Sequence, residues 1–96
     1  MSGEIQSIGI IGAGQMGNGI AQVCALGGFA VLLNDLSQEK INSGLATIDG
    51  NMARDVTRGN IKDADRKAAL SRIQPAPSIE DLGDCDLVIE AATENE

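Results

Sequence analysis

The sequence predicts an α/β protein built on a parallel β-sheet, and two observations carry this prediction. Short apolar runs, typical of buried strands, alternate with longer segments in which apolar residues recur at helical spacing. Five glycines lie within residues 8–22, where the first apolar run meets the first helical segment. The chain has 96 residues, of which 43% are hydrophobic, so we expect one domain with a single core.

The first part of the chain predicts a strand, a helix and a second strand. Isoleucines dominate residues 5–11, which predict a short strand. Residues 15–27 predict a helix whose apolar stripe consists of Met16, Ile20, Val23, Cys24 and Gly27. Residues 29–34 (FAVLLN) form a second apolar run, typical of a strand that is covered on both faces.

A long amphipathic helix is expected after the second strand. Ser37 predicts its N-cap, and Gly59 predicts its end. Its apolar stripe, at steps of four and three residues, consists of Ile41, Leu45, Ile48, Met52 and Val56.

The remaining predicted elements are shorter. Residues 63–72 predict a helix capped at Asp63, and a short strand is expected at Ile73, before two prolines. Ser78, followed three residues later by an acid, predicts one turn of helix. Residues 86–91 (DLVIEA) predict a buried strand. This alternation of strands and helices favours a parallel sheet.

A G-x-G-x-x-G motif occupies the turn between the first strand and the first helix. It consists of Gly12, Ala13, Gly14, Gln15, Met16 and Gly17. Gly12 would permit a tight turn, Gly14 would let a pyrophosphate approach the backbone, and Gly17 would let the helix lie close to the strand. Amide groups at the helix N-terminus would then point at the phosphate oxygens. The alternative is a purely structural glycine turn.

Asp35 follows the second strand, 18 positions after Gly17. An acid at this place in a dinucleotide-binding sheet accepts hydrogen bonds from the adenine-ribose hydroxyls. Because a carboxylate there repels a 2′-phosphate, NAD is favoured over NADP as the cofactor. The alternative roles for Asp35 are a solvated strand end or a helix cap. The succession of strand, glycine turn, helix, strand and acid predicts a Rossmann-like doubly wound sheet. A P-loop is excluded, because no Gly-Lys-Ser/Thr follows the glycines.

Charge and composition argue against several other functions. The formal net charge of −7 disfavours nucleic acid and anionic membrane surfaces as partners. Cys24 and Cys85 lack metal-type spacing, so we expect no metal site and two buried thiols in a reducing compartment. The sequence has no basic signal region and no apolar run long enough for a bilayer, so the cytoplasm is the expected location. Asp84 and Asp86 are interpreted as a solvated turn.

These features resemble the N-terminal NAD-binding domain of the 3-hydroxyacyl-CoA dehydrogenase family, especially its 3-hydroxybutyryl-CoA branch. The resemblance is carried by GAGQMGNGIAQ (12–22), VLLND (31–35) and DCDLVIEAATENE (84–96), and the segments between them follow the family's order. It covers the whole chain but only the opening portion of a family enzyme. The 3-hydroxyisobutyrate and 6-phosphogluconate dehydrogenases share GxGxMG, but they usually continue with a proline and MA, which decides against them.

The resemblance implies roles for individual residues. Residues 12–17 are similar to the family's pyrophosphate loop, and Asp35 is similar to its adenine-ribose acid. Glu94 matches a glutamate that lies near the nicotinamide half of the cofactor in the family, and its alternative role is that of a solvated acid. Asn51 and Arg58 fall near positions that contact CoA, although Arg58 is equally well explained as a surface basic residue.

The resemblance also implies what is absent. The family uses a histidine as its general base, and this sequence contains no histidine, so we assign no catalytic residue. We expect residues 1–96 to be a partial NAD-binding domain without the C-terminal strands and the helical substrate domain, through which the enzyme would form a homodimer. The expected parent reaction oxidises a 3-hydroxyacyl-CoA to a 3-oxoacyl-CoA in fatty-acid or butanoate metabolism. The alternatives are a stand-alone nucleotide-binding or regulatory module and a non-enzymatic structural relative.

The last predicted strand raises a further expectation. In the usual order, 3-2-1-4-5-6, it lies beside the first strand and precedes a fifth. We therefore expect an unpaired edge, and one sheet face near Ile10, Val88 and Ile89 without cover. The 96-residue chain is then expected to associate with itself or with the remainder of the enzyme.

Overall fold

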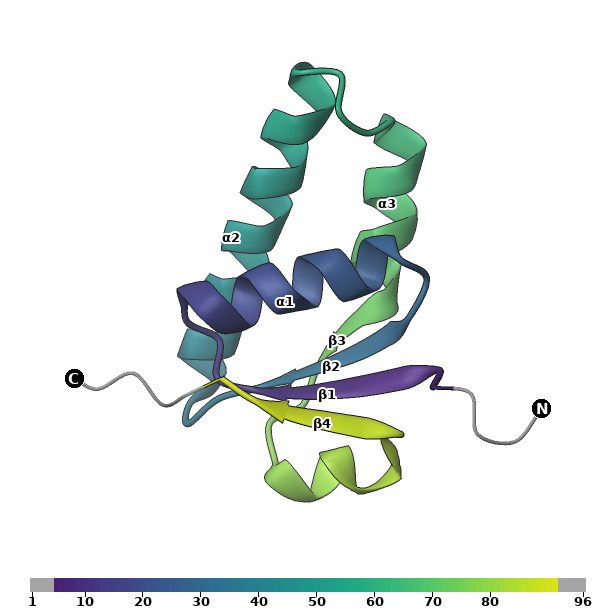
Figure 1. The fold of residues 1–96 in the computed structure, drawn as a ribbon. Coiled ribbons are helices and arrows are strands. Elements are labelled where there is room, and N and C mark those ends of the chain that lie inside the picture. Colours follow the sequence, from purple (N-terminus) through teal and green to yellow (C-terminus); the bar gives the residue numbers. More distant parts are fainter. Residues whose placement is uncertain (1–4, 92–96) are drawn as a thin grey trace.

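The computed structural model describes residues 5–91, which form a four-stranded parallel sheet in the order β3-β2-β1-β4 (Figure 1). The strands are β1 (Ser7–Ile11), β2 (Ala30–Asn34), β3 (Ile73–Pro75) and β4 (Leu87–Glu90). The helices are α1 (Gln15–Leu26), α2 (Gln38–Thr57) and α3 (Asp63–Arg72), together with the 3-10 helix η1 (Ile79–Asp84). The predicted α/β class and the position of the last strand beside the first are confirmed.

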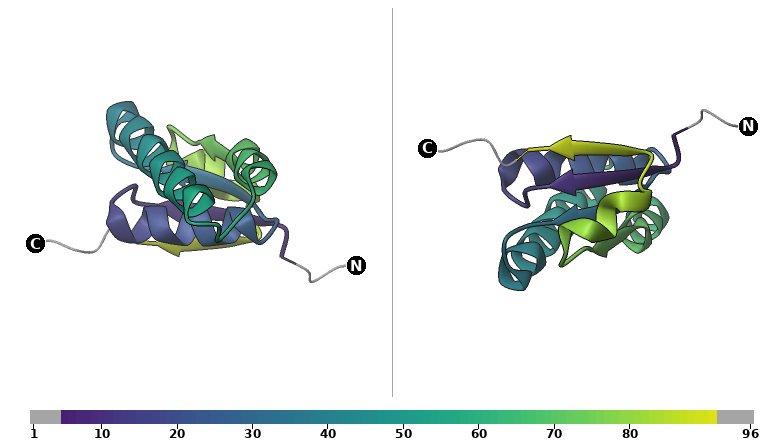
Figure 2. Two further views of the ribbon diagram at one scale, coloured as in Figure 1. Left: turned by 90° about the horizontal axis from the view of Figure 1, so that it is seen from above. Right: turned by 90° about the horizontal axis from the view of Figure 1, so that it is seen from below.

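The helices are distributed unequally over the two faces of the sheet. Figure 1 shows α1, α2 and α3 on one face and the short η1 on the other. In Figure 2, α1 runs alongside β1, whereas α2 and α3 lie next to each other on the β2 and β3 side. The carboxyl end of β1 therefore leads directly into the start of α1.

Alternate residues of the two central strands form the middle of the core. Ile8 pairs with Val31 and Ile10 pairs with Leu33, and none of the four is more than 4% exposed. The expectation that Ile10 lacks cover is wrong, because its side chain points toward α1. Its Cγ2 lies 3.4 Å from the position that a Cβ on Gly17 would take.

α1 packs on the sheet through its smallest residues. Ala21 and Ala25 are fully buried, and Gly17 lies against the glycine loop. The expected stripe is wrong at Met16 and Val23, which are 51% and 70% exposed. Small residues let the helix approach the sheet closely, and larger ones on that face would hold it away. Other members of the stripe are partly buried beside the core: Ile20 and Cys24.

β4 forms one edge of the sheet in the described part of the chain, which confirms the expected unpaired edge. The strand is not buried as expected, since Leu87 is 40% exposed and Val88 is 44% exposed. Val88 is thus uncovered as expected, whereas Ile89 is partly buried against the core. An edge strand has a neighbour on one side only, and this explains the greater exposure.

Asp86 joins the beginning of β4 to the beginning of β1. Its Oδ2 accepts hydrogen bonds from the backbone N–H groups of Gln6 (2.8 Å) and Ser7 (3.1 Å). These bonds hold the pKa of the Asp86 carboxyl below its ordinary value. Asp84 and Asp86 are both exposed, as expected for a solvated turn, and the bonds to β1 give Asp86 an additional role. β1 accordingly begins two residues later than expected, and Ile5 before it is 45% exposed.

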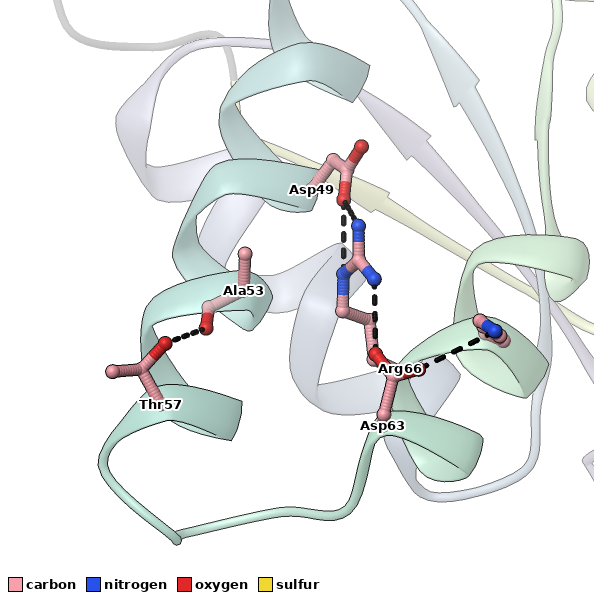
Figure 3. A network of polar contacts seen from close by, with 6 residues as sticks. Asp49, Ala53, Thr57, Asp63 and Arg66 are labelled. Carbon is pink, nitrogen blue, oxygen red and sulfur yellow. Dashed lines mark hydrogen bonds and ion pairs between the residues drawn. The ribbon is translucent and has the colours of Figure 1, made fainter.

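α2 and α3 form a hairpin that ion pairs hold together (Figure 3). Arg66 of α3 contacts Asp49 of α2 through two nitrogens, at 2.7 and 3.1 Å, and contacts Asp63 at 3.1 Å. Lys67 pairs with Asp63 at 3.4 Å. Asp63 is the first residue of α3 and not its cap as expected, because the backbone is still extended at the residue before it (φ −88°, ψ 153°). The N-cap is Lys62, whose backbone N–H donates to an acid in the first turn.

Candidate cofactor-binding site

The glycine loop connects the carboxyl end of β1 to α1. Gly12 has a φ of 111°, a left-handed conformation that favours glycine, and its N–H donates to the Asn34 carbonyl at 2.8 Å. Gly14 is the N-cap of α1, and no described side chain caps the helix there. Because the first N–H groups of a helix have no partner within it, those of α1 are available to a ligand.

Gly14 and Gly17 meet different requirements. A Cβ on Gly17 would lie 1.8 Å from the carbonyl oxygen of Gly12, so only glycine permits this close approach of helix and loop. A Cβ on Gly14 would meet no atom within 4 Å. The open space at Gly14, next to free backbone amides, fits a pyrophosphate group, whose negative charge is favoured at a helix N-terminus.

Asp35 lies directly beside this loop. Its Oδ2 accepts a hydrogen bond from the Ala13 N–H at 2.7 Å, and its Oδ1 accepts one from the Leu36 N–H at 2.6 Å. Parallel pairing places Ile11 opposite Asn34, so the ends of β1 and β2 are neighbours. The carboxylate is partly buried, and each oxygen retains a lone pair for a further donor such as a ribose hydroxyl. The structure thus brings the expected ribose acid and the expected phosphate loop together.

A groove of about 560 Å³ extends from the glycine loop along α2. It is lined by Ala13, Gly14, Gln15, Asn18, Gly19, Ser43, Thr47 and Asn51. Asn51, one of the two expected substrate contacts, therefore shares a groove with the loop. Arg58 does not line this groove, because it is the exposed C-cap of α2. Glu94 lies outside the described residues.

Two buried asparagines near the loop were not predicted. The Asn34 side chain donates to the Ala76 carbonyl at 2.7 Å and ties the end of β2 to the segment after β3. Asn18 is 4% exposed, and its Oδ1 has no hydrogen-bond partner among the described residues. A Cβ on Gly44 of α2 would lie 2.7 Å from this oxygen, so the glycine makes room for the amide. The sequence offered one sign of this burial, since each asparagine is a polar residue within a segment of apolar or small residues.

The described residues contain neither a membrane-crossing helix nor a metal centre. Within residues 5–91, no helix is both long and apolar enough to cross a membrane, and no three His, Cys, Asp or Glu side chains could together hold a metal ion. Cys24 and Cys85 are free and partly buried, and burial raises the pKa of both thiols. A raised pKa lowers thiol reactivity, which favours a packing role for both residues.

The order of elements matches proteins that bind a dinucleotide at the carboxyl ends of parallel strands. A strand leads through a glycine turn into a helix, and an acid, Asp35, follows the second strand. Fold and site together define a Rossmann-type dinucleotide-binding domain. Comparison with known families is more specific: residues 7–96 match the model of the 3-hydroxyacyl-CoA dehydrogenase, NAD binding domain. The chain belongs to this family, whose cofactor is NAD.

Named relatives and solved structures agree with the family. A 3-hydroxybutyryl-CoA dehydrogenase from Bradyrhizobium diazoefficiens is 54% identical over all 96 residues, which cover 33% of that protein. The crystal structure of (S)-3-hydroxybutyryl-CoA dehydrogenase from Ralstonia eutropha has a TM-score of 0.91 and 44% identity, over 97% of this chain and 33% of that one. A 3-hydroxyadipyl-CoA dehydrogenase from Escherichia coli is 40% identical over 95% of this chain and 19% of that protein. The chain thus spans a third or less of the length of these proteins.

Proposed function

We propose that the chain is the NAD-binding part of a 3-hydroxyacyl-CoA dehydrogenase, with 3-hydroxybutyryl-CoA as the preferred substrate class. The observation that carries the proposal is the hydrogen bond from the Ala13 N–H to Asp35, which places the ribose acid beside the open space at Gly14. The printed names of the relatives support the substrate class.

Residues 12–17 would hold the cofactor mainly through their backbone. Free N–H groups at the start of α1 bind the pyrophosphate, and the exposed side chains of Gln15 and Met16 flank it. Asp35 accepts the adenine-ribose hydroxyls and disfavours a 2′-phosphate, which gives NAD the advantage over NADP. Bound NAD supplies the acceptor for the hydride that leaves C3 of the substrate. The role of Glu94 near the nicotinamide half rests on the family resemblance.

The acyl-CoA would lie along the α2 groove. Ser43, Thr47 and Asn51 supply hydroxyl and amide groups there, which can both donate and accept hydrogen bonds. Arg54 contacts the Asn51 side chain, and Arg58 follows one helical turn later. Guanidinium groups suit the phosphates of CoA, so α2 would offer hydrogen-bonding side chains within the groove and two basic residues beyond it in the sequence.

Calorimetric titration of the purified chain with NADH and NADPH tests cofactor binding. We expect NADH to bind more tightly, and Asp35→Ala to lose about 1–3 kcal/mol of binding free energy, the cost of an unmade hydrogen bond to a charged group. Glu39→Ala removes an exposed acid from the first turn of α2 and is the matched control. Equal affinities of the two cofactors for the unchanged chain would contradict the proposal.

Loss of NADH absorbance in the presence of acetoacetyl-CoA tests catalysis. Because the sequence holds no histidine, we expect the 96 residues alone to show no turnover, although they bind NADH. Turnover above buffer, from protein proven free of host enzyme, would show that the chain contains a general base that we have not assigned.

We further propose a cytoplasmic location and a homodimeric parent enzyme. Two free cysteines support a reducing compartment, and the family resemblance supports the dimer. Cell fractionation followed by immunodetection tests the location, and sedimentation of the protein purified from its source tests the assembly.

A further inference from the structure

Two successive amide groups of the glycine loop are bonded to two successive residues at the end of β2. The Gly12 N–H donates to the Asn34 carbonyl at 2.8 Å, and the Ala13 N–H donates to Asp35 Oδ2 at 2.7 Å. The other oxygen of Asp35 accepts from the Leu36 N–H at 2.6 Å, so both oxygens hold a backbone amide. Ala13 is only 8% exposed, so little water can replace its bond.

We propose that Asp35 is a positioning residue for the pyrophosphate loop, in addition to its contact with the ribose. The proposal rests on the NAD-binding function proposed above. By fixing Ala13, Asp35 sets the direction of the N–H groups that follow at the start of α1. The second lone pair of each oxygen remains free for a ribose hydroxyl. One carboxylate therefore organises the binding of both the phosphates and the ribose.

This positioning role requires an accepting oxygen opposite the partly buried Ala13 N–H. An asparagine could keep that bond through its one accepting oxygen, because the other N–H, that of Leu36, is exposed to water. An alanine removes both accepting oxygens and leaves the Ala13 N–H without a partner. A partly buried N–H without an acceptor is unfavourable, and the loop would rearrange to avoid it.

The affinity for phosphates distinguishes whether Asp35 positions the loop or only contacts the ribose, because the two cases predict opposite changes when its charge is removed. A carboxylate beside the loop repels the phosphates of a ligand, so neutralising it strengthens phosphate binding if the loop keeps its geometry. If Asp35 positions the loop, the same substitution weakens phosphate binding. A diphosphate ligand without ribose hydroxyls isolates this difference.

The experiment compares ADP with 2′,3′-dideoxyadenosine 5′-diphosphate by calorimetry on the purified chain. We expect Asp35→Ala to weaken the dideoxy ligand about tenfold, the effect of one lost hydrogen bond to a charged group, and to weaken ADP at least as much. Glu39→Ala, which removes one exposed negative charge from α2, is the matched control and should leave both affinities unchanged. Unchanged or tighter binding of the dideoxy ligand to Asp35→Ala would overturn the proposal.

A second variant and a ligand-free measurement complete the test. Asp35→Glu keeps the charge but displaces both oxygens by one methylene, so it should also weaken the dideoxy ligand. The Ala13 N–H should exchange faster with solvent in Asp35→Ala, while the N–H of the buried Leu33 stays protected. If the unchanged chain binds neither ligand, exchange at Ala13 alone decides the positioning role, and the NADH titration decides the NAD-binding proposal.

Discussion

At the scale of single residues, two glycines of the loop serve different purposes, one in folding and the other in the proposed binding of the cofactor. Gly17 is required by the protein itself, because a Cβ would lie 1.8 Å from the Gly12 carbonyl oxygen. Gly14 has φ −79° and ψ −168°, extended backbone that any residue adopts, and a Cβ there would face open space. The fold therefore does not require glycine at position 14, and the open space there leaves room for the pyrophosphate of the proposed cofactor.

Gly14→Val should abolish NADH binding and leave the sheet intact, because the isopropyl group would fill the space of the pyrophosphate and its Cβ would meet no protein atom within 4 Å. NADH fluorescence measures binding, and circular dichroism measures the fold. Gly17→Ala is the contrasting variant, and we expect it to destabilise the fold itself by about 1–3 kcal/mol through overpacking. Normal NADH binding by Gly14→Val would show that the loop is only a structural turn.

The Asp86 carboxyl should make stability depend on pH. Its folded-state pKa is lowered by the N–H groups of Gln6 and Ser7. Its contribution is therefore complete above the unfolded value of about 3.9 and is lost as the pH falls through the lower folded value. We expect the urea midpoint to drop in this acid range and Asp86→Asn to flatten part of that drop. The exposed Asp84→Asn is the control, and identical slopes for the two variants would refute the role of Asp86.

At the scale of elements, polar contacts between distant residues orient the helices. Arg66 joins α3 to α2 through Asp49, at 2.7 Å. Arg72 donates to the Ala25 carbonyl at 2.7 Å and joins the end of α3 to the end of α1, where a positive charge is favoured. These contacts hold α2 beside α1, and Asn51 consequently lies in the groove that starts at the loop.

Enlarging one residue on each side of α1 tests which face of the helix is buried. Ala21→Leu should lower the free energy of unfolding by about 1–3 kcal/mol, since its site is fully buried against the sheet. Val23→Leu, at a position that is 70% exposed, should change it by less than about 0.5 kcal/mol. Urea denaturation measures both. A larger loss for Val23→Leu than for Ala21→Leu would show that α1 buries the apolar stripe expected from the sequence.

At the scale of the whole molecule, the two faces of the sheet are covered to different degrees. Three helices fill one face, whereas η1 alone lies on the other in the described part of the chain. Beside it, β4 presents a free edge and the half-exposed Leu87 and Val88. An unpaired strand with exposed apolar side chains favours association with another chain.

We therefore expect the purified chain to self-associate through β4. Sedimentation velocity at increasing concentration should show growing species, and Val88→Lys should reduce them, because a charge on an edge strand opposes pairing. Val23→Lys places the same charge on the exposed side of α1 and should have less effect. A monomer at all concentrations would contradict this expectation.

The sequence by itself determined the order of the elements and the identity of the loop. α3 spans the residues expected for it, and β1 differs only in its start. Apolar spacing, glycine content and helix caps depend on neighbours in the chain, so local physics is enough to predict them. The position of Asp35, at a strand end after a glycine motif, is likewise a local feature, and it predicts a contact with the ribose.

Only the tertiary structure decided which face of α1 is buried and what the acids bind. Apolar character shows that a side chain can be buried, but the distance of closest approach selected Ala21 over Val23. The bonds of Asp35 to Ala13 and of Asp86 to Gln6 join residues 22 and 80 positions apart. Such contacts form only when strands from distant parts of the chain are brought side by side, and no local pattern in the sequence records that arrangement.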